Sequence, residues 1–328
     1  MKSNTLNNLF HLIRNQIRFL REYDSICEIE RLLKQQRVLC FWGHLGEAYL
    51  AAAVWHYLEN RHDFIVLLVK EQEYVKQVFD LFPDKKNIKI INGRARNIIV
   101  KKFCNEKKFS DWNAFTEFGE KNKASTMMSA FKRLGGITEE TYIKPFVYEN
   151  KEKQINASHL LKSLNCTLEK TVFIFPEAES LILVNETPEF WILLADKLSK
   201  AGFSVIFNSK STFGSYKSVF LPVADAVCLA KVCGYVIGKR NGMLDVLAGA
   251  TETIIEAIYP VFTKENQDCY NFITRYYSFS DKKNGEENYL EVASLKGIRN
   301  DNKIIEVIWQ DDLEEFSDLL VANILEAR

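Results

Sequence analysis

Short, mostly apolar runs alternate along the chain with amphipathic stretches, and this alternation predicts an α/β protein. The runs occur at 37–42, 64–69, 88–91, 171–175, 204–207, 235–237 and 253–258. Such runs are typical of strands in a parallel sheet that helices cover on both faces. Segments with helical spacing separate the runs, at 47–58, 71–82, 155–164, 188–200, 225–233 and from 244 onward. The order of strands and helices predicts doubly wound, Rossmann-like sheets.

The alternation occurs twice, on either side of a less regular, lysine-rich segment from 93 to 151. A chain of 328 residues also exceeds the usual size of one domain, which is about 100–200 residues. We therefore expect two Rossmann-like domains that face a cleft, spanning residues 1–150 and 151–328. The hinge is expected near 145–168, and a C-terminal helix over 311–328 could pack back across it.

The N-terminal segment 6–33 has apolar residues at helical spacing, with Arg14, Arg18 and Arg21 between them. This pattern predicts an amphipathic helix, which we expect to pack on the first domain. The alternative is that its basic face rests on an anionic membrane surface.

Composition narrows the class of protein. Hydrophobic residues make up 47% of the chain and charged residues 26%, enough apolar material for two packed cores. Lys plus Arg and Asp plus Glu number 43 each, which gives no reason to expect a nucleic-acid partner. The seven cysteines lack metal-ligand spacing. With no apolar span of about 18 residues and no signal-peptide pattern, the sequence predicts a cytoplasmic protein.

In the first half, candidate chemistry lies where the strand at 37–42 meets the following helix. The turn contains two glycines and His44, and Glu47 follows in the first helical turn. Ligands of open α/β sheets bind at such strand ends. Glu47 is therefore a candidate general base, and His44 is a second candidate. The alternative is that Glu47 only stabilises the start of the helix.

In the second half, the corresponding turn spans residues 238–245. Gly242 would let the backbone approach a ligand, and Lys239 and Arg240 are suited to neutralise a diphosphate. Asn241 and Asp245 could bind sugar hydroxyls. A plain polar turn would have the same composition. Other strand ends supply further candidates for one shared site, namely Glu177, Glu179, Ser180, Asn208 and Pro222.

Several motifs are absent from the sequence. It contains no Asp-x-Asp pair to hold a divalent metal on a diphosphate, so we expect a metal-independent reaction with no cofactor. It also lacks the dinucleotide fingerprint Gly-x-Gly-x-x-Gly, the P-loop and the Gly-x-Ser-x-Gly elbow. These absences count against a dehydrogenase, an NTPase or an α/β-hydrolase.

The two turns resemble those of the heptosyltransferases, which are inverting glycosyltransferases of the GT-B fold (glycosyltransferase family 9). Gly46-Glu47 stands where that family has Gly-Asp. The segment 239–245 stands where it has Asp-(Ser/Thr)-Gly-(Leu/Met)-x-His, with Arg240 in place of Asp and Asp245 in place of His. These replacements argue against assigning heptose as the sugar, and the Arg-x-Gly-x-x-Asp form is also similar to turns of other GT-B transferases.

The resemblance implies a transfer from a nucleotide-sugar donor, bound by the C-terminal domain, to a saccharide or lipid-linked glycan acceptor, bound by the N-terminal domain. Glu47 would deprotonate the acceptor, and Arg240 would stabilise the leaving diphosphate. The protein would then act in the synthesis of a bacterial surface polysaccharide or lipopolysaccharide, and it would contact the inner membrane surface peripherally. A nucleotide-sugar epimerase on the same scaffold and a catalytically silent nucleotide-sugar-binding protein remain as alternatives.

Overall fold

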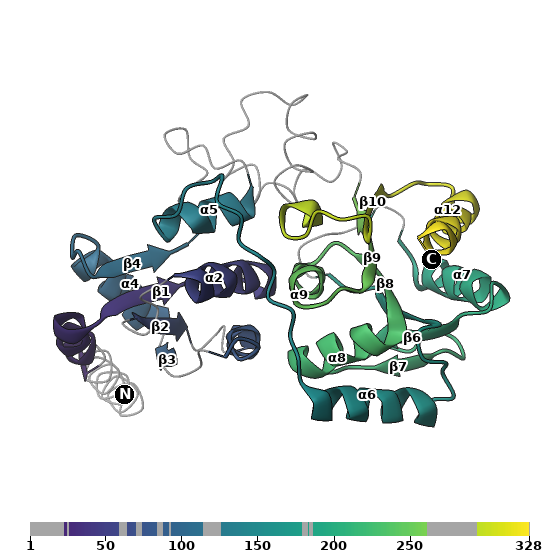
Figure 1. Cartoon of the computed structure of the whole chain (residues 1–328), viewed down its shortest axis with the longest axis horizontal. Helices are drawn as coiled ribbons and strands as arrows, with labels where there is room; N and C mark the ends of the chain where they lie inside the picture. Colours follow the sequence, from purple (N-terminus) through teal and green to yellow (C-terminus); the bar gives the residue numbers. More distant parts are fainter. Residues whose placement is uncertain are drawn as a thin grey trace, which may run out of the picture.

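The computed structural model describes residues 23–24, 26–58, 64–69, 74–83, 88–91, 93–113, 126–178, 183, 186–260 and 294–327. These residues form an α/β protein with two parallel sheets, one in each half of the chain (Figure 1). The expected helix over 6–33 lies mostly outside the described residues, but 26–35 are helical. None of the described helices is long and apolar enough to cross a bilayer.

The first sheet has the strand order β3-β2-β1-β4, and all its described pairings are parallel. Its strands are β1 (Arg37–Phe41), β2 (Phe64–Val69), β3 (Ile88–Ile91) and β4 (Phe109–Trp112). Its helices are α2 (Leu45–Tyr57), α3 (Lys76–Phe79), α4 (Gly93–Phe103) and α5 (Met127–Leu134). Successive strand residues point to opposite faces, so β1 packs Leu39 and Phe41 with α2, α3 and α5, and Val38 and Cys40 with α4.

The second sheet has six strands in the order β10-β9-β8-β5-β6-β7. Its strands are β5 (Thr171–Phe175), β6 (Ser204–Asn208), β7 (Lys217–Val219), β8 (Gly234–Lys239), β9 (Ile254–Tyr259) and β10 (Ile304–Ile308). Its helices are α6 (Lys151–Ser163), α7 (Pro188–Lys200), α8 (Val223–Cys233), α9 (Gly242–Ala250) and α12 (Leu313–Glu326), with a short 3₁₀ turn, η5 (Leu295–Gly297).

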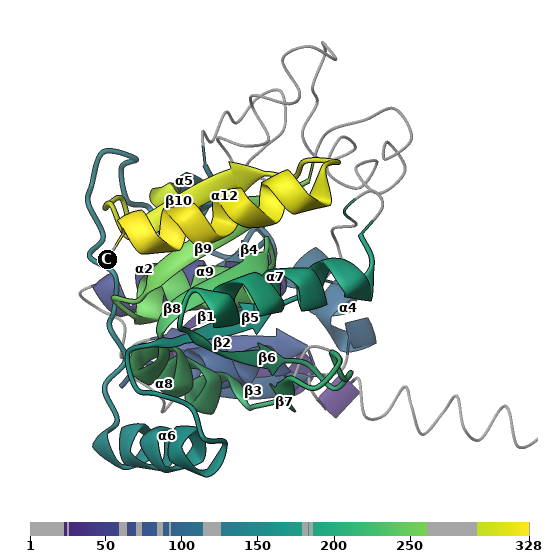
Figure 2. The same cartoon turned by 90° about the vertical axis from the view of Figure 1, so that its right-hand side faces the viewer.

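Both faces of the second sheet are covered, as Figure 2 shows, with α7 and α12 on one side and α8 and α9 on the other. Local sequence signals determine where two of its helices begin or end. Proline occupies the first position of α7, where its missing N–H costs no hydrogen bond. Gly234 ends α8 with φ +91°, a left-handed conformation that favours glycine.

The two halves meet through α2 and α9. Glycines allow this close approach, because a Cβ at position 46 would lie 2.0 Å from Asp245 Oδ2, and a Cβ at position 242 would lie 2.7 Å from the Gly46 nitrogen. A Cβ at position 249 would lie 2.0 Å from the ring of Tyr49. The pairs run in the same order along both helices, so α2 and α9 lie side by side with their N-terminal ends together.

The segment between α5 and α6 joins the halves by contacting both. Phe146 stacks on Phe82 and donates its N–H to the Tyr49 hydroxyl in the first half. Tyr148 donates its N–H to Ala250 O in the second half, over 2.9 Å. A single cluster of buried apolar side chains therefore extends from α2 and α3 through to α8 and α9.

Several expected boundaries require correction. Helix α2 begins at Leu45, so Gly46 is a helical residue, and β8 continues to Lys239, which leaves only residues 240–241 as the turn before α9. Helix α3 is only four residues long. The C-terminal helix packs on α7 and β9 within the second half, where Asn323 donates to Glu256 Oε1. The sequence pattern also missed α4, β4, α5, β7 and β10.

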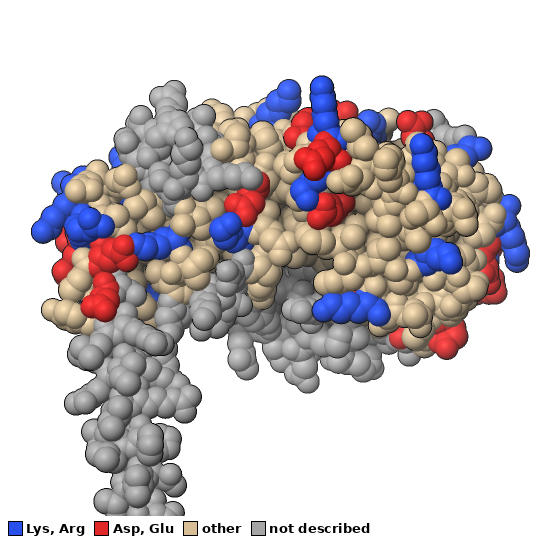
Figure 3. Space-filling model, turned by 90° about the horizontal axis from the view of Figure 1, so that it is seen from below, with Lys and Arg blue, Asp and Glu red and all other residues tan. Residues whose placement is uncertain are grey.

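On the face shown in Figure 3, the Lys and Arg side chains of the described residues are interspersed with Asp and Glu. Neither sign forms a continuous patch in this view. The arrangement matches the equal totals of positive and negative residues in the sequence.

Candidate active site

The strand order locates a candidate site in the second half. From β5 the chain proceeds to β6 and β7 on one side, and then returns to place β8 on the other side of β5. Open α/β sheets bind their ligands at such a switch point, beyond the carboxyl ends of the strands. The residues that follow β5 and β8 begin with Pro176 and Arg240, respectively.

Hydrogen bonds join three of the predicted segments at this edge. Asn241 Nδ2 donates to the backbone oxygen of Glu177 over 2.9 Å, so the loops after β8 and β5 are in contact. The hydroxyl of Ser209, which follows Asn208 at the end of β6, donates to the carboxylate of Glu177. Glu177 is exposed and thus accessible to a ligand. Glu179 and Ser180 lie outside the described residues.

The start of α9 is capped by its own turn. Asn241 Oδ1 accepts the N–H groups of Met243 and Leu244, at 2.9 and 3.0 Å. This is a standard N-cap, and the positive end of the helix lies at the carboxyl edge of the sheet, directly after β8. Asn241 therefore links the helix start to the Glu177 loop with a single side chain.

Lys239 is held away from the exposed edge. It is a strand residue with 7% of its surface exposed, and its ammonium donates to Glu186 Oε2 over 2.5 Å. Glu186 Oε1 also accepts from the indole N–H of Trp191, at 2.9 Å. Lys239 thus forms a largely buried ion pair with Glu186, a residue that the sequence pattern did not indicate.

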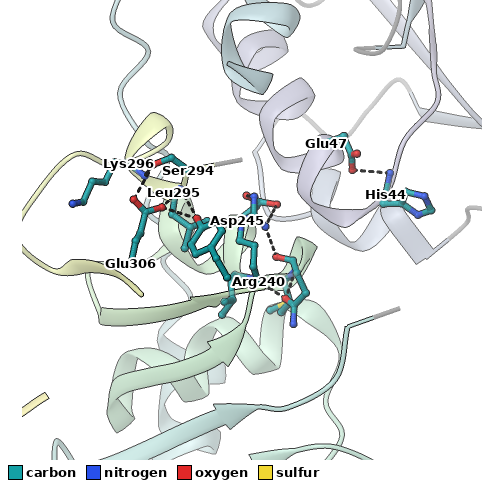
Figure 4. Close-up of polar contacts among 12 residues, drawn as sticks. His44, Glu47, Arg240, Asp245, Ser294, Leu295, Lys296 and Glu306 are labelled. Atoms are coloured by element: carbon teal, nitrogen blue, oxygen red, sulfur yellow. Dashed lines mark hydrogen bonds and ion pairs between the residues drawn. The ribbon is translucent and has the colours of Figure 1, made fainter. Parts of the chain in front are cut away.

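Arg240 and Asp245 form a bidentate ion pair across the first turn of α9 (Figure 4). Arg240 Nη2 lies 2.5 Å from Asp245 Oδ1, and Nη1 lies 3.0 Å from Oδ2. The exposed side-chain fractions are 12% and 10%. The pKa of Asp245 is raised to about 6, mainly because the carboxyl group is buried. The negative charge of Glu47 also raises this pKa, and the positive charge of Arg240 opposes both effects. The two residues expected to bind separate parts of a ligand therefore bind each other.

In the first half, Glu47 and His44 lie at the start of α2 (Figure 4). Glu47 Oε2 accepts the backbone N–H of His44 at 3.0 Å, as the third residue of a helix does in a capping box. The His44 ring is exposed, and its Nδ1 lies 3.1 Å from the hydroxyl of Tyr74. Glu47 is half-buried, and this hydrogen bond holds its carboxylate against the backbone at the start of α2.

Pro222, the fourth predicted segment, precedes α8 beside the first half. The N–H of Val223 donates to Gln77 Oε1 of α3 over 3.0 Å. A shallow depression of about 320 Å³ lies over α3 and is lined by Tyr74, Lys76, Gln77 and Asp80. Pro222 is therefore placed at the junction of the halves, next to the residue that joins α8 to α3.

The structure thus brings the starts of α2 and α9 together. Gly46 and Gly242 are in backbone contact, and the Glu47 charge reaches Asp245. Tyr74, Gln77 and Glu186 were missed, because each contacts its partner only across a long stretch of sequence. Within the described part of the chain, no three His, Cys, Asp or Glu residues are grouped as metal ligands would be.

No family model and no curated protein matches this sequence. Solved structures, however, are similar in fold. A glycosyl transferase family 9 protein from Veillonella parvula superposes with a TM-score of 0.54 at 11% identity, over 89% of this chain and 97% of that chain.

Two proteins from E. coli give comparable superpositions over 89% of this chain. ADP-heptose LPS heptosyltransferase II has a TM-score of 0.53 at 9% identity and is covered to 98%. Heptosyltransferase WaaC, solved with ADP, has a TM-score of 0.53 at 9% identity and is covered to 100%. The chain therefore has the α/β fold of these glycosyltransferases, and the resemblance expected from its two turns is confirmed for the fold.

Proposed function

We propose that this protein is a glycosyltransferase that moves a sugar from a nucleotide-sugar donor to a saccharide or lipid-linked glycan acceptor. The observation that carries the proposal is the meeting of two helix starts, α2 and α9, at the carboxyl ends of the strands. One helix start offers a carboxylate and the other a capped positive end, which suit an acceptor hydroxyl and a diphosphate, respectively.

The solved structures support the same class of substrate. One E. coli neighbour is an ADP-heptose LPS heptosyltransferase, and another was solved with ADP. We place the nucleotide in the second half, at the switch point between β5 and β8, as the resemblance of the turn at 239–245 implies. The acceptor then enters from the first half through a cleft between the domains. Synthesis of a surface polysaccharide or lipopolysaccharide at the inner face of the membrane is the setting that fits these neighbours.

We propose direct displacement with inversion and no metal. Glu47 would take the proton of the acceptor hydroxyl, with His44 as the second candidate, while the N-terminal end of α9 stabilises the departing diphosphate. Arg240 would add positive charge beneath that end, and Asp245 would fix the orientation of its guanidinium through the bidentate pair. The absence of Asp-x-Asp supports a reaction that needs no bridging cation.

A panel of nucleotide sugars tested by thermal shift, followed by an acceptor assay that measures nucleotide release, tests this proposal. A donor present at 100 times its Kd should stabilise the fold by about 2.7 kcal/mol. Transfer should continue in EDTA. Loss of transfer on chelation, restored by magnesium or manganese, would contradict the metal-independent mechanism, and the absence of any nucleotide binding would contradict the whole proposal.

A matched pair of cap variants sharpens the assignment of the site. Asn241→Ala removes the cap of α9 and the bond to Glu177, whereas Asn150→Ala removes the cap of α6 and a bond to the Tyr148 hydroxyl, away from the carboxyl edge. Both should lower stability by about 0.5–2 kcal/mol. Only Asn241→Ala should weaken donor binding. An equal donor affinity in both variants would argue against the switch point as the nucleotide site.

A catalytically silent nucleotide-sugar-binding protein is the second candidate. It is favoured by the intramolecular partners of Glu47, Lys239 and Arg240, each of which already has a hydrogen bond or an ion pair. Such a protein would bind the donor yet release no nucleotide with any acceptor. An epimerase on the same scaffold would convert the donor with no acceptor present, so the same assay separates the three functions.

A further inference from the structure

Phe220 is an exposed aromatic residue at the carboxyl edge of the second sheet. It follows the short strand β7 and has 58% of its surface exposed. Every other phenylalanine whose burial the structure describes is buried or half-buried. Exposing a phenyl ring forgoes the stabilisation that its burial would give.

A cation already lies over this ring. Lys210 Nζ is 4.5 Å from the ring centroid, within the distance of a cation–π contact. Lys210 is itself exposed and belongs to the loop after β6. The edge therefore presents an electron-rich face and a positive charge together, on two adjacent loops.

These two loops continue the candidate site along the edge of the sheet. Ser209 donates its N–H to Val219 O over 2.9 Å, which joins the end of β6 to the residue before Phe220. Ser209 in turn bonds Glu177, and Glu177 bonds Asn241. An unbroken series of contacts therefore leads from the start of α9 to Phe220.

The spacing of the strands matches an extended nucleotide. From β5 to β7 there are two strand spacings of about 4.8 Å, or roughly 10 Å along the edge. A ribose and base that extend from a diphosphate at the switch point cover a distance of this order. A base reaching in this direction would meet an aromatic face.

From this geometry we infer that Phe220 and Lys210 bind the nucleobase of the donor, with the base stacked on the phenyl ring and Lys210 beside it. The inference rests on the proposed function and specifies the nucleotide end of the same site. Stacking is favourable for every base, because every base has a π-face. It is stronger for a purine, whose two rings cover more of the phenyl group.

The test measures binding to the full chain by calorimetry, with a purine nucleoside diphosphate, a pyrimidine nucleoside diphosphate and inorganic pyrophosphate. Phe220→Leu keeps an apolar side chain and removes the π-face, while Phe220→Tyr restores it. Tyr142→Leu is the control, because Tyr142 is 75% exposed and belongs to the segment after α5.

Phe220→Leu should weaken purine diphosphate binding by roughly 5- to 100-fold, the usual effect of losing one stacked base. Pyrophosphate binding should not change, because it has no base. Phe220→Tyr and Tyr142→Leu should bind like the wild type, and Lys210→Met should show a smaller loss than Phe220→Leu.

The outcomes separate this inference from the proposed function. If the wild type binds the nucleotide and Phe220→Leu binds it equally well, the base lies elsewhere and the inference is overturned, while the proposed function stands. An equal loss for pyrophosphate would likewise overturn base stacking. If the wild type binds no nucleotide at all, both proposals fail.

Discussion

The two carboxyl edges of this molecule differ in how they hold their charges. In the second half, Lys239 is buried and Arg240 largely so, and they are paired with Glu186 and Asp245. In the first half, His44 is exposed and Glu47 is half-buried, bound to a backbone N–H of its own helix start. The second edge is therefore fixed by ion pairs within the fold, whereas the first has more exposed side chains, and neither His44 nor Glu47 forms a buried ion pair of this kind among the described residues.

The difference suggests a division of roles between the halves. Buried, bidentate pairs hold a guanidinium in one orientation, which suits a site that binds one constant group such as a diphosphate. A half-buried carboxylate near a helix start suits a group that exchanges protons with an incoming hydroxyl. Substitutions on each side test this contrast, beginning with the largest expected effect.

The largest effect is expected on turnover for Glu47→Gln. Glutamine keeps an oxygen that can accept the His44 N–H, so the helix start should retain its shape. If Glu47 is the base, turnover should fall roughly 10²- to 10⁴-fold with donor affinity unchanged. Steady-state rates and donor binding are measured on the same preparation.

A matched variant separates catalysis from helix capping. Glu152→Gln removes a carboxylate from the first turn of α6, in the second half. Both variants should lose about 0.3–1 kcal/mol of stability through the helix dipole. A Glu47→Gln protein that turns over like Glu152→Gln would refute the base assignment and make His44 the first candidate.

The next largest effect is expected on stability for Arg240→Met. This change leaves Asp245 buried with no guanidinium, and breaking a buried pair in this way costs about 3–5 kcal/mol. Urea unfolding measures the loss. The double variant Arg240→Met with Asp245→Leu should recover much of it, because it leaves no buried charge unpaired. A single variant as stable as the wild type would show that the pair is not a fixed part of the second edge.

The sequence predicted the elements whose signals are local. Helix α7 has the predicted bounds, because Pro188 opens it and Gly202 follows its end. The elements that were missed carry weak local signals. Strand β7 is only three residues long, β4 contains Ser110 and Asp111, and α4 begins at a glycine. Tertiary pairing with neighbouring strands defines such short elements, and hydrophobic periodicity cannot show it.

The candidate site was predicted only in part. Placing Glu177, Asn208 and Asn241 at one edge follows from the alternation of strands and helices, because the carboxyl ends of parallel strands share one edge of the sheet. The sequence did not show which charged side chains are buried and paired with one another. The pairs Lys239–Glu186 and Arg240–Asp245 depend on side-chain direction and burial, and Glu186 lies 53 residues from its partner. A single sequence gives the residue types at a site but not which of them satisfy one another.

A smaller effect is expected from pH, through a carboxyl group on the second sheet. Glu256 is completely buried on β9, with Oε1 accepting from Asn323, and burial raises its pKa to about 8 from 4.5. Because the folded pKa is raised, the protonated form favours the fold, and this stability is lost as pH rises from about 4.5 through about 8. Between about pH 6 and 8 the wild type should lose about 2 kcal/mol relative to Glu256→Gln. Parallel curves of stability against pH for the two proteins would contradict a protonated Glu256.

The smallest effect is expected for Lys76→Met in the first half. Lys76 Nζ lies 2.7 Å from Asp80 one helical turn away, but the two side chains are 41% and 35% exposed. Water screens such a pair, so its loss should cost less than about 1 kcal/mol, and added salt should reduce even that. The comparison variant is Lys239→Met, which leaves the largely buried Glu186 without its cation. Chemical unfolding at low and high salt should show a larger, salt-insensitive loss for Lys239→Met, and equal losses for the two variants would remove the contrast between the edges.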